Sequence, residues 1–232
     1  MSGSSVANVS GGEVRLAALV EDYFDGTSVN TSRWVIGIGN GGFGTPPRIE
    51  NGVLIVNASS ISSTTPITAA SLPVAVEGRV RFISPNQQAG INGFVDVGLG
   101  DALDVAVVRS NDANALFITD QDNLVYANDF QPGFYPNLSG RQRTLISGFT
   151  WSQFHDIRLV VNSNRVDYYV DGVLQTSHTL TTPLTAIPLY LWFASLNPNY
   201  DFAADWLRLA RYPSSGQFTS CPVDHQRQHQ LG

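Results

Sequence analysis

The feature that most constrains the fold is a set of short alternating segments joined by tight turns in the second half of the chain. Residues 156–161 and 165–170 alternate between apolar and polar side chains, and an Asn-Ser-Asn turn separates them. An Asp-Gly pair at 171–172 then leads into a third segment at 173–178. Alternation with a period of two is typical of half-buried strands, and an Asp-Gly pair tolerates the positive φ that a hairpin turn needs. This region predicts three antiparallel strands with a fixed register.

Similar signals recur along the rest of the chain, and no segment of convincing length shows a helical period. In 73–83 the valines share one face, and Glu77, Arg79 and Arg81 share the other. Charged residues make up only 14% of the chain, against roughly 25% in an average soluble domain, whereas turn-forming Gly (21) and Pro (12) are frequent. About a dozen strands in one uninterrupted run predict an all-β fold, a two-sheet antiparallel β-sandwich. The other predicted strands are at 52–57, 93–99, 105–109, 116–119, 124–127, 188–195 and 203–212.

The strand signals predict one domain between two polar ends. Residues 1–12 are expected to form a flexible N-terminal lead, residues 13–213 the sandwich, and residues 214–232 a polar tail or linker stub. The chain of 232 residues has a single cysteine, Cys221, which cannot form an internal disulfide. The first twelve residues lack the basic and apolar regions of an intact signal peptide. We nevertheless expect an extracellular or cell-surface protein.

The charge balance excludes several classes of partner. All 13 basic residues are arginine, so chemistry that needs a lysine is ruled out. With 19 acidic residues the net charge is −6, which argues against binding to nucleic acid or to an anionic membrane. No apolar run approaches the roughly 20 residues that a membrane span needs.

Three stretches in the order expected of one family carry a resemblance. They are the opening sequence EDYFDGTSVNTSRW at 21–34, NGVLIV at 51–56, and the closing region from FHDIRL at 154–159 to ADWLRL at 204–209. Together they resemble bacterial laminarinase-like (family-16 glycoside hydrolase) and laminin-G-like domains of the concanavalin A-like superfamily. The resemblance implies a jelly-roll sandwich whose concave sheet handles sugars.

The resemblance also implies where catalytic acids would lie. Family-16 enzymes carry two glutamates around an aspartate on one strand, which points all three carboxylates into the cleft. The strand here that is best placed to match contains Asp96 as the middle acid, but Phe94, Gly98 and Leu99 occupy the flanking positions. No catalytic residue is therefore assigned. An alternative is a hydrolase of this fold in which Asp96 acts with a distant acid such as Asp104 or Asp201.

A structural calcium ion is a further implication of the resemblance. In those families a backbone carbonyl on the first strand, a carbonyl at the turn before the second, and an aspartate on the final strand hold the ion. The matching positions are Tyr23, Gly52 and Asp205. Calcium prefers such oxygen ligands.

Aromatic residues beside amides indicate where a sugar could bind, because pyranose rings stack on aromatic faces while polar groups bond their hydroxyls. In the late strand Tyr190 and Trp192 share one face, and Leu191 and Phe193 share the other, which we assign to the core. This leaves Tyr190 and Trp192 for a ligand. The remaining predicted ligand-binding residues are Phe94, Asp96, Tyr135 and Asn197.

The sequence thus predicts a non-catalytic carbohydrate-binding or adhesion module of a secreted bacterial protein, monomeric in isolation. Its expected partner is a polysaccharide or glycan bound on the concave sheet. Two alternatives stay open. One is a glycoside hydrolase of the same fold, and the other is a laminin-G-like structural or protein-interaction domain.

Overall fold

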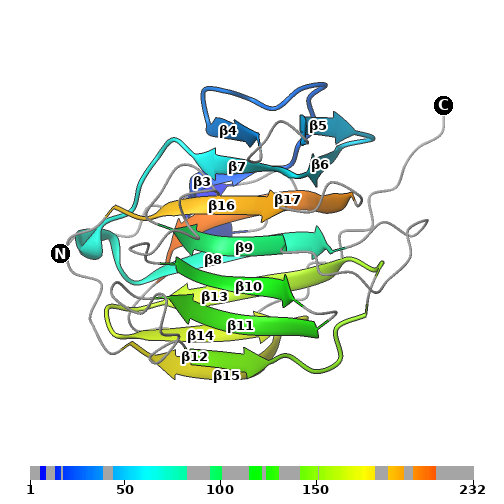
Figure 1. Ribbon diagram of the computed structural model, residues 1–232. Coiled ribbons are helices and arrows are strands. Elements are labelled where there is room, and N and C mark those ends of the chain that lie inside the picture. Colours follow the sequence, from blue (N-terminus) through cyan, green and yellow to red (C-terminus); the bar gives the residue numbers. More distant parts are fainter. Residues whose placement is uncertain are drawn as a thin grey trace.

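The computed structural model describes residues 6–8, 14–16, 18–38, 44–82, 95–100, 115–121, 124–130, 142–150, 152–180, 188–195 and 201–212. Their strands form two large antiparallel sheets that face each other (Figure 1). The seven-stranded sheet has the order β12 (Gln142–Leu145), β11 (Leu124–Phe130), β10 (Ala115–Gln121), β9 (Val95–Gly100), β16 (Tyr190–Ser195), β7 (Ser59–Ser63) and β4 (Trp34–Ile38).

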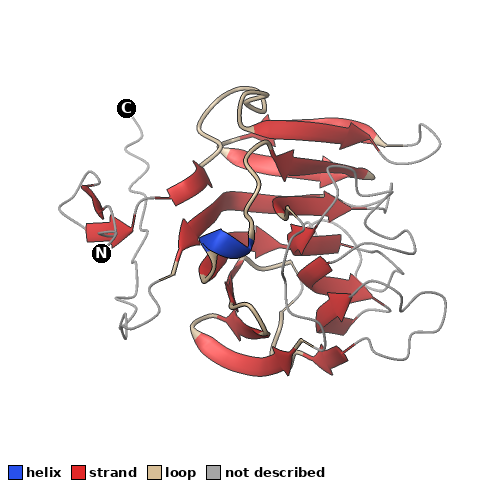
Figure 2. Ribbon diagram, turned by 90° about the vertical axis from the view of Figure 1, so that its left-hand side faces the viewer, coloured by secondary structure: helices blue, strands red, loops and turns tan. Residues whose placement is uncertain are grey.

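The second large sheet completes the sandwich. Its order is β15 (Val173–Thr179), β14 (Arg165–Val170), β13 (His155–Val161), β8 (Val74–Arg81), β17 (Phe202–Arg211), β6 (Val53–Asn57) and β5 (Thr45–Glu50), with β3 (Ala18–Asp22) also paired to β17. A separate pair joins β1 (Val6–Asn8) to β2 (Val14–Leu16). The one helix among the described residues is the short 3-10 turn η1 (Ala69–Ser71), which lies where the chain crosses from β7 to β8 (Figure 2). The predicted two-sheet antiparallel sandwich is confirmed.

The core lies between the two sheets and is built by the alternation seen in the sequence. Val97 and Leu99 of β9 and Leu191 and Phe193 of β16 are fully buried members of one apolar cluster. They face the inner residues of the opposite sheet, which include Leu159 and Tyr168. Burying side chains of this size contributes roughly 1.5–3 kcal/mol each, so the inner faces supply most of the driving force for folding.

The opening motif of the chain has a structural role. The Asp22 carboxylate accepts hydrogen bonds from the Phe24 amide (2.9 Å) and from Trp34 Nε1 (2.7 Å). Phe24 adopts a φ of 54°, and both it and Trp34 are 1% exposed within the core. One carboxylate therefore satisfies the indole N–H that would otherwise be buried without an acceptor, which explains why these residue types occur together.

The two sheets are joined at the β12 and β15 edge. The Thr144 hydroxyl lies 2.9 Å from His178 Nε2, and Gln142 Nε2 donates to the Thr179 carbonyl. His178 is buried, and this burial lowers the pKa of its imidazole. These polar contacts close one side of the sandwich.

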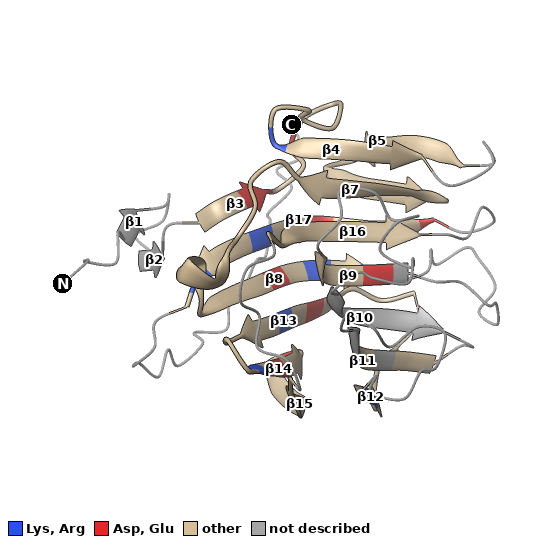
Figure 3. Cartoon of the chain, turned by 60° about the vertical axis from the view of Figure 1, so that its left-hand side comes forward, with Lys and Arg blue, Asp and Glu red and all other residues tan. Residues whose placement is uncertain are grey.

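Most of the described charged residues lie on strands of the eight-membered sheet (Figure 3). Arg208 Nη1 lies 2.7 Å from Glu77 Oε2, and Arg208 Nε lies 3.4 Å from Glu21 Oε1. The guanidinium of Arg158 lies 4.4 Å from the ring centroid of Tyr169, and that of Arg81 lies 4.8 Å from Phe154. Cross-strand registers place Arg208 opposite Glu77 and Glu21, and Arg158 opposite Tyr169, so these strands carry a ladder of arginines, carboxylates and an aromatic ring.

Several elements differ from the sequence prediction. β1, β2, β3, β4, β5, β7 and β12 were not predicted as strands. The predicted segment at 105–109 lies outside the described residues. The hairpin through residues 120–123 is confirmed, because β10 and β11 pair in register from Gln121 opposite Leu124.

Candidate functional site

The candidate site is the face of the seven-stranded sheet that points away from the core. Its central strand, β9, places Val97 and Leu99 in the core, so Asp96, Gly98 and Gly100 occupy the outward positions. β9 is paired on both sides, by β10 and by β16. Asp96 is therefore held on a rigid central strand rather than on a loop, which is where a fold positions a functional group most accurately.

β16 supplies the aromatic part of this face. The core assignment of Leu191 and Phe193 is confirmed, so Tyr190, Trp192 and Ala194 take the outward positions. Trp192 lies opposite Gly98 of β9 on one side and opposite Ser62 of β7 on the other. The indole thus rests between two residues with little or no side chain.

The floor around Trp192 consists of small residues. Ala194 is paired with Asp96 and with Ser60, and Ser60 and Ser62 are each 1% exposed. On the inner side of β7, Ser63 Oγ accepts a hydrogen bond from the Leu191 amide (3.0 Å) and donates one to the Thr65 carbonyl (2.9 Å). The buried Ser63 hydroxyl is thus fully hydrogen-bonded, as a buried polar group requires.

Burial is the main difference between this face and an open sugar platform. Trp192 and Asp96 are each only 1% exposed, although neither belongs to the core cluster, whereas Tyr190 is half-buried. A ligand can contact Trp192 or Asp96 only when the atoms that cover them move aside. Tyr190 is the part of this aromatic pair that solvent reaches in the structure.

The backbone register adds positions that the sequence did not single out. Thr119 of β10 is paired with Asp96, and Phe117 with Gly98. Asn128 of β11 is in turn paired with Phe117. The backbones of β10 and β11 therefore continue this sheet beyond β9 and β16. The sequence could have indicated these positions only through the register of the hairpin. That register can be used only when the strands that neighbour β9 are known.

Other predicted residues cannot be placed on this face. Phe94, Tyr135 and Asn197 lie outside the described residues, as does the alternative acid Asp104. Asp201, the other distant acid, precedes β17 of the opposite sheet and binds Arg48 Nη2 at 2.9 Å.

Asp201 also accepts a hydrogen bond from Asn57 Nδ2 at 3.3 Å. Its described partners thus belong to β5 and β6, far from the strand that carries Asp96 in the sheet order. Its contacts are those of a structural ion pair rather than of a catalytic partner for Asp96.

The three positions predicted to bind calcium lie at neighbouring ends of β3 and β6 and at the bulge of β17 between them. β17 pairs with β6 through Phe202–Ala204 and with β3 from Leu207 onward, and Asp205 lies in the bulge between the two pairings. Tyr23 directly follows β3, and Gly52 directly precedes β6.

The Asp205 carboxylate is suited to a cation. Its nearest cationic neighbour is Arg79 Nε at 3.9 Å, which is too long for a hydrogen bond, and its side chain is 28% exposed. The described residues contain no group of three or more His, Cys, Asp or Glu that could hold a metal. The predicted ligands, two carbonyls and one carboxylate, are all oxygen atoms, the type of ligand that calcium prefers.

A histidine–aspartate pair on the other sheet is structural. His155 Nδ1 lies 2.7 Å from Asp171 Oδ2, and His155 Nε2 lies 3.0 Å from the backbone of Thr150. Asp171 Oδ1 accepts from the Asp156 amide at 2.9 Å. The predicted turn at 171–172 is confirmed, with φ of 49° and 77°, and the carboxylate fastens this turn to the start of β13.

The comparisons with known proteins concern the fold. No protein-family model matches the chain, and no curated protein matches it in sequence. Among solved structures, the endo-beta-1,3-glucanase from Pyrococcus furiosus matches with a TM-score of 0.66 and 15% identity, over 90% of this chain and 99% of that chain. The laminarinase catalytic domain from Thermotoga petrophila matches with a TM-score of 0.61 and 16% identity, over 83% and 96% of the two chains.

A third match separates fold from activity. A Mycobacterium tuberculosis protein, described as an immunostimulatory antigen and pseudo beta-1,3-glucanase, matches with a TM-score of 0.60 and 13% identity, over 84% of this chain and 99% of that chain. Within the described part of this chain, no helix has the length and apolar character to cross a membrane. The chain has the jelly-roll sandwich fold of these glucanases.

Proposed function

We propose that this chain is a non-catalytic glycan-binding module that takes a polysaccharide on the outward face of the seven-stranded sheet. The observation that carries the proposal is the composition of β9. Its outward positions hold one carboxylate, Asp96, followed by Gly98, and the sequence places Phe94 before it. Retaining hydrolysis needs two carboxylates about 5 Å apart, and this strand supplies only one.

The outward face of the seven-stranded sheet still carries groups that could bind a sugar, although β9 supplies only one carboxylate. The half-buried ring of Tyr190 offers an apolar face for a pyranose ring. Trp192 and Asp96 join that contact once the atoms that cover them move aside. Neighbours described as β-1,3-glucanases support a β-1,3-glucan as the first ligand to test. Such a ligand is encountered outside the cell, which agrees with the proposed extracellular location.

The decisive experiment measures binding and turnover on the same preparations. We expect the protein to be retarded in affinity gels that contain laminarin, and the Trp192→Ala variant to lose this retardation. Trp206→Ala is the matched control, because Trp206 is a half-buried indole on the opposite sheet. Equal retardation of wild type and Trp192→Ala would contradict the proposed site, provided that both variants melt cooperatively.

A hydrolase is the second candidate, because the structural neighbours include active glucanases. It requires the release of reducing sugar from laminarin by the wild type and the loss of that release in Asp96→Asn. Asp201→Asn serves as the control, since its described partners are on the other sheet. Turnover that depends on Asp96 would replace the binding proposal with the enzymatic one.

We also propose that calcium occupies the junction of β3, β6 and β17. Carbonyls of Tyr23 and Gly52 and the carboxylate of Asp205 would hold the ion, which would tie three strands together at the bulge. Chelation is then expected to lower the melting temperature, and Asp205→Asn to abolish the response to calcium. Asp156→Asn, which alters another partner of Arg79, is the control. A melting temperature that changes with neither calcium nor chelator would refute the assignment.

A further inference from the structure

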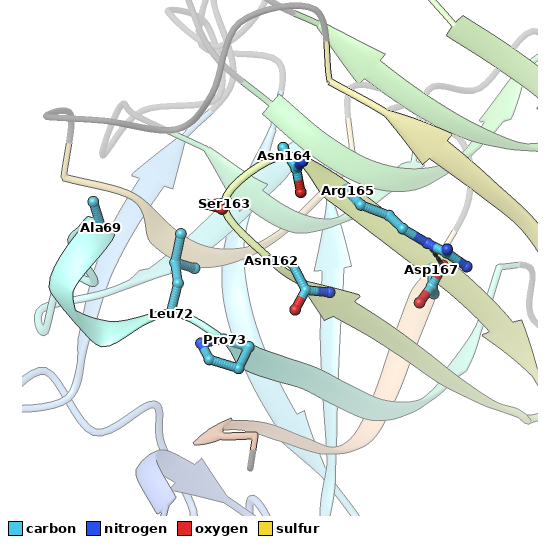
Figure 4. Close-up of a pocket in the computed structure, with 8 residues that line it drawn as sticks. All are labelled: Ala69, Leu72, Pro73, Asn162, Ser163, Asn164, Arg165 and Asp167. Atoms are coloured by element: carbon cyan, nitrogen blue, oxygen red, sulfur yellow. Dashed lines mark hydrogen bonds and ion pairs between the residues drawn. The ribbon is translucent and has the colours of Figure 1, made fainter. Parts of the chain in front are cut away.

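A second concave site lies at the end of the sandwich where β13 turns into β14. It is a pocket of about 580 Å³, within the range of small-molecule sites. Figure 4 shows the 162–164 turn and the start of β14 on one side of it, and η1 with the start of β8 on the other. None of its lining residues belongs to the seven-stranded sheet.

The apolar wall of the pocket is formed by Ala69, Leu72 and Pro73. The chain next to this wall is well fastened. Ile67 exchanges two backbone hydrogen bonds with Leu189, of 2.7 and 2.8 Å, and the Pro73 carbonyl accepts from the Tyr212 amide at 2.8 Å. The wall therefore needs no ordering when a ligand arrives, which lowers the entropic cost of binding.

The opposite wall is polar and its backbone is already satisfied. The Asn162 amide donates to the Arg165 carbonyl, and the Asn164 carbonyl accepts from the Leu180 amide, each at 2.8 Å. The side chains of Asn162, Ser163 and Asn164 make no hydrogen bond to any described residue. Two amides and one hydroxyl thus line the pocket with their full capacity for a ligand.

The remaining polar groups are held in place by one another. Arg165 Nε lies 2.6 Å from Asp167 Oδ1, and Arg165 Nη2 donates to Ser177 Oγ at 2.9 Å. Ser177 Oγ in turn donates to Asp167 Oδ1 at 2.5 Å. This triangle neutralises the two charges within the wall while leaving Asp167 Oδ2 outside these hydrogen bonds. The site therefore presents placed polar atoms without a net charge, which favours a neutral ligand over an ion.

Aromatic residues adjoin the polar wall. Tyr169 follows Asp167 on the same outward face of β14, and burial, followed by the nearby carboxylate of Asp167, raises the pKa of its phenol. Neither this ring nor that of Tyr212, whose amide donates to the Pro73 carbonyl, is part of the pocket lining. An apolar wall that faces free amides and a hydroxyl matches the chemistry of small-molecule sites that bind a neutral polar ligand.

We propose that this pocket is a second saccharide site, which holds one or two neutral sugar units between the 162–164 turn and the Leu72–Pro73 wall. Asn162, Ser163 and Asn164 bond the ring hydroxyls, and the C–H face of the sugar packs on Leu72 and Pro73. Because none of these residues lies on the seven-stranded sheet, the site is independent of the function proposed above. A single such site is expected to be weak, with a Kd on the order of 1 mM.

The test follows the side-chain amide signals of Asn162 and Asn164 by ¹H–¹⁵N NMR during titration with laminaritriose. The signals are assigned from their loss in Asn162→Ala and Asn164→Ala. Neither residue has a positive φ, so alanine is compatible with the backbone. We expect saturable shifts in the wild type, and at least a tenfold weaker affinity at this site in the double variant, followed through the amide of Leu72.

Two controls separate this site from the sheet face. Gln153→Ala removes an exposed amide that lies outside the pocket, and is expected to leave the titration unchanged. Trp192→Ala is also expected to leave the Asn162 and Asn164 shifts unchanged, whatever it does to laminarin binding. The proposal is overturned if these signals stay fixed up to about 20 mM laminaritriose. It is overturned equally if the double variant binds as tightly as the wild type at Leu72.

Discussion

Replacing Arg208 by methionine should destabilise the protein strongly, because this arginine holds two carboxylates on one sheet face. Its side chain is 11% exposed and contacts Glu77 at 2.7 Å and Glu21 at 3.4 Å. Removing one partner of a buried ion pair costs about 3–5 kcal/mol, since the remaining charge stays desolvated. The two carboxylates here are 24% and 27% exposed, so water recovers part of that cost. We therefore expect a loss of about 3 kcal/mol in the free energy of unfolding.

Chemical denaturation and calorimetry would measure this loss, which corresponds to a fall in melting temperature of roughly 6–12 °C for a domain of this size. Arg79→Met is the matched control, because Arg79 is 40% exposed and its ion pairs measure 3.3 and 3.9 Å. It should cost less than about 1 kcal/mol. Adding Glu77→Gln to Arg208→Met should restore stability by removing one carboxylate. Equal losses from the two methionine variants, measured with a chelator present, would refute this reasoning.

Three further predictions concern the core and one edge. Phe193→Ala should lower the free energy of unfolding by about 3–5 kcal/mol in denaturant titrations, because a fully buried ring leaves a cavity; a loss below about 1 kcal/mol would place Phe193 outside the core. Gly78→Ala should cost about 1–3 kcal/mol in the same assay, since the new methyl carbon would lie 2.7 Å from Leu207 Cδ2; unchanged stability would mean that Leu207 moves aside freely. Burial lowers the pKa of His178 in the folded state, so below the unfolded value of about 6.5 the unfolded chain binds more protons. Stability should therefore fall as the pH drops from 7 to 5, and a His178→Gln variant, which can still reach Thr144, should show a smaller fall in melting temperature over that range.

Much of the fold follows from local patterns in the sequence. Alternation in 165–170 predicted that Val166, Tyr168 and Val170 share one face, and all three are buried in the core. The assignment of Leu191 and Phe193 to the core also follows from the sequence. Although β16 is buried on both faces, its two large side chains without polar atoms pack between the two sheets. Such inferences need only a period of two and the preference of apolar groups for the interior.

The candidate site was less predictable, because it depends on which strands become neighbours. The sequence SSISS at 59–63 lacks the apolar alternation of a strand, yet it forms β7, in which the Ser63 hydroxyl bonds the Leu191 amide and the Thr65 carbonyl. Without β7 and the register of β16, nothing in the sequence places Ser62 and Gly98 on either side of Trp192. The burial of Trp192 could not be predicted either, because alternation shows which side chains share a face but not which atoms cover that face.

The pairing of Gly98 with Trp192 has a consequence for how this protein could change over time. Gly98 occupies one of the two positions beside Asp96 that carry glutamates in the family-16 pattern, and it shares the outward face with Asp96. Side chains opposite each other in such a pair stand only about 4.5–5.5 Å apart at Cβ, so a glutamate there would compete with the indole for one space. A long carboxylate side chain at position 98 would therefore call for a smaller side chain at position 192. Evolution and engineering alike would have to change positions 98 and 192 together.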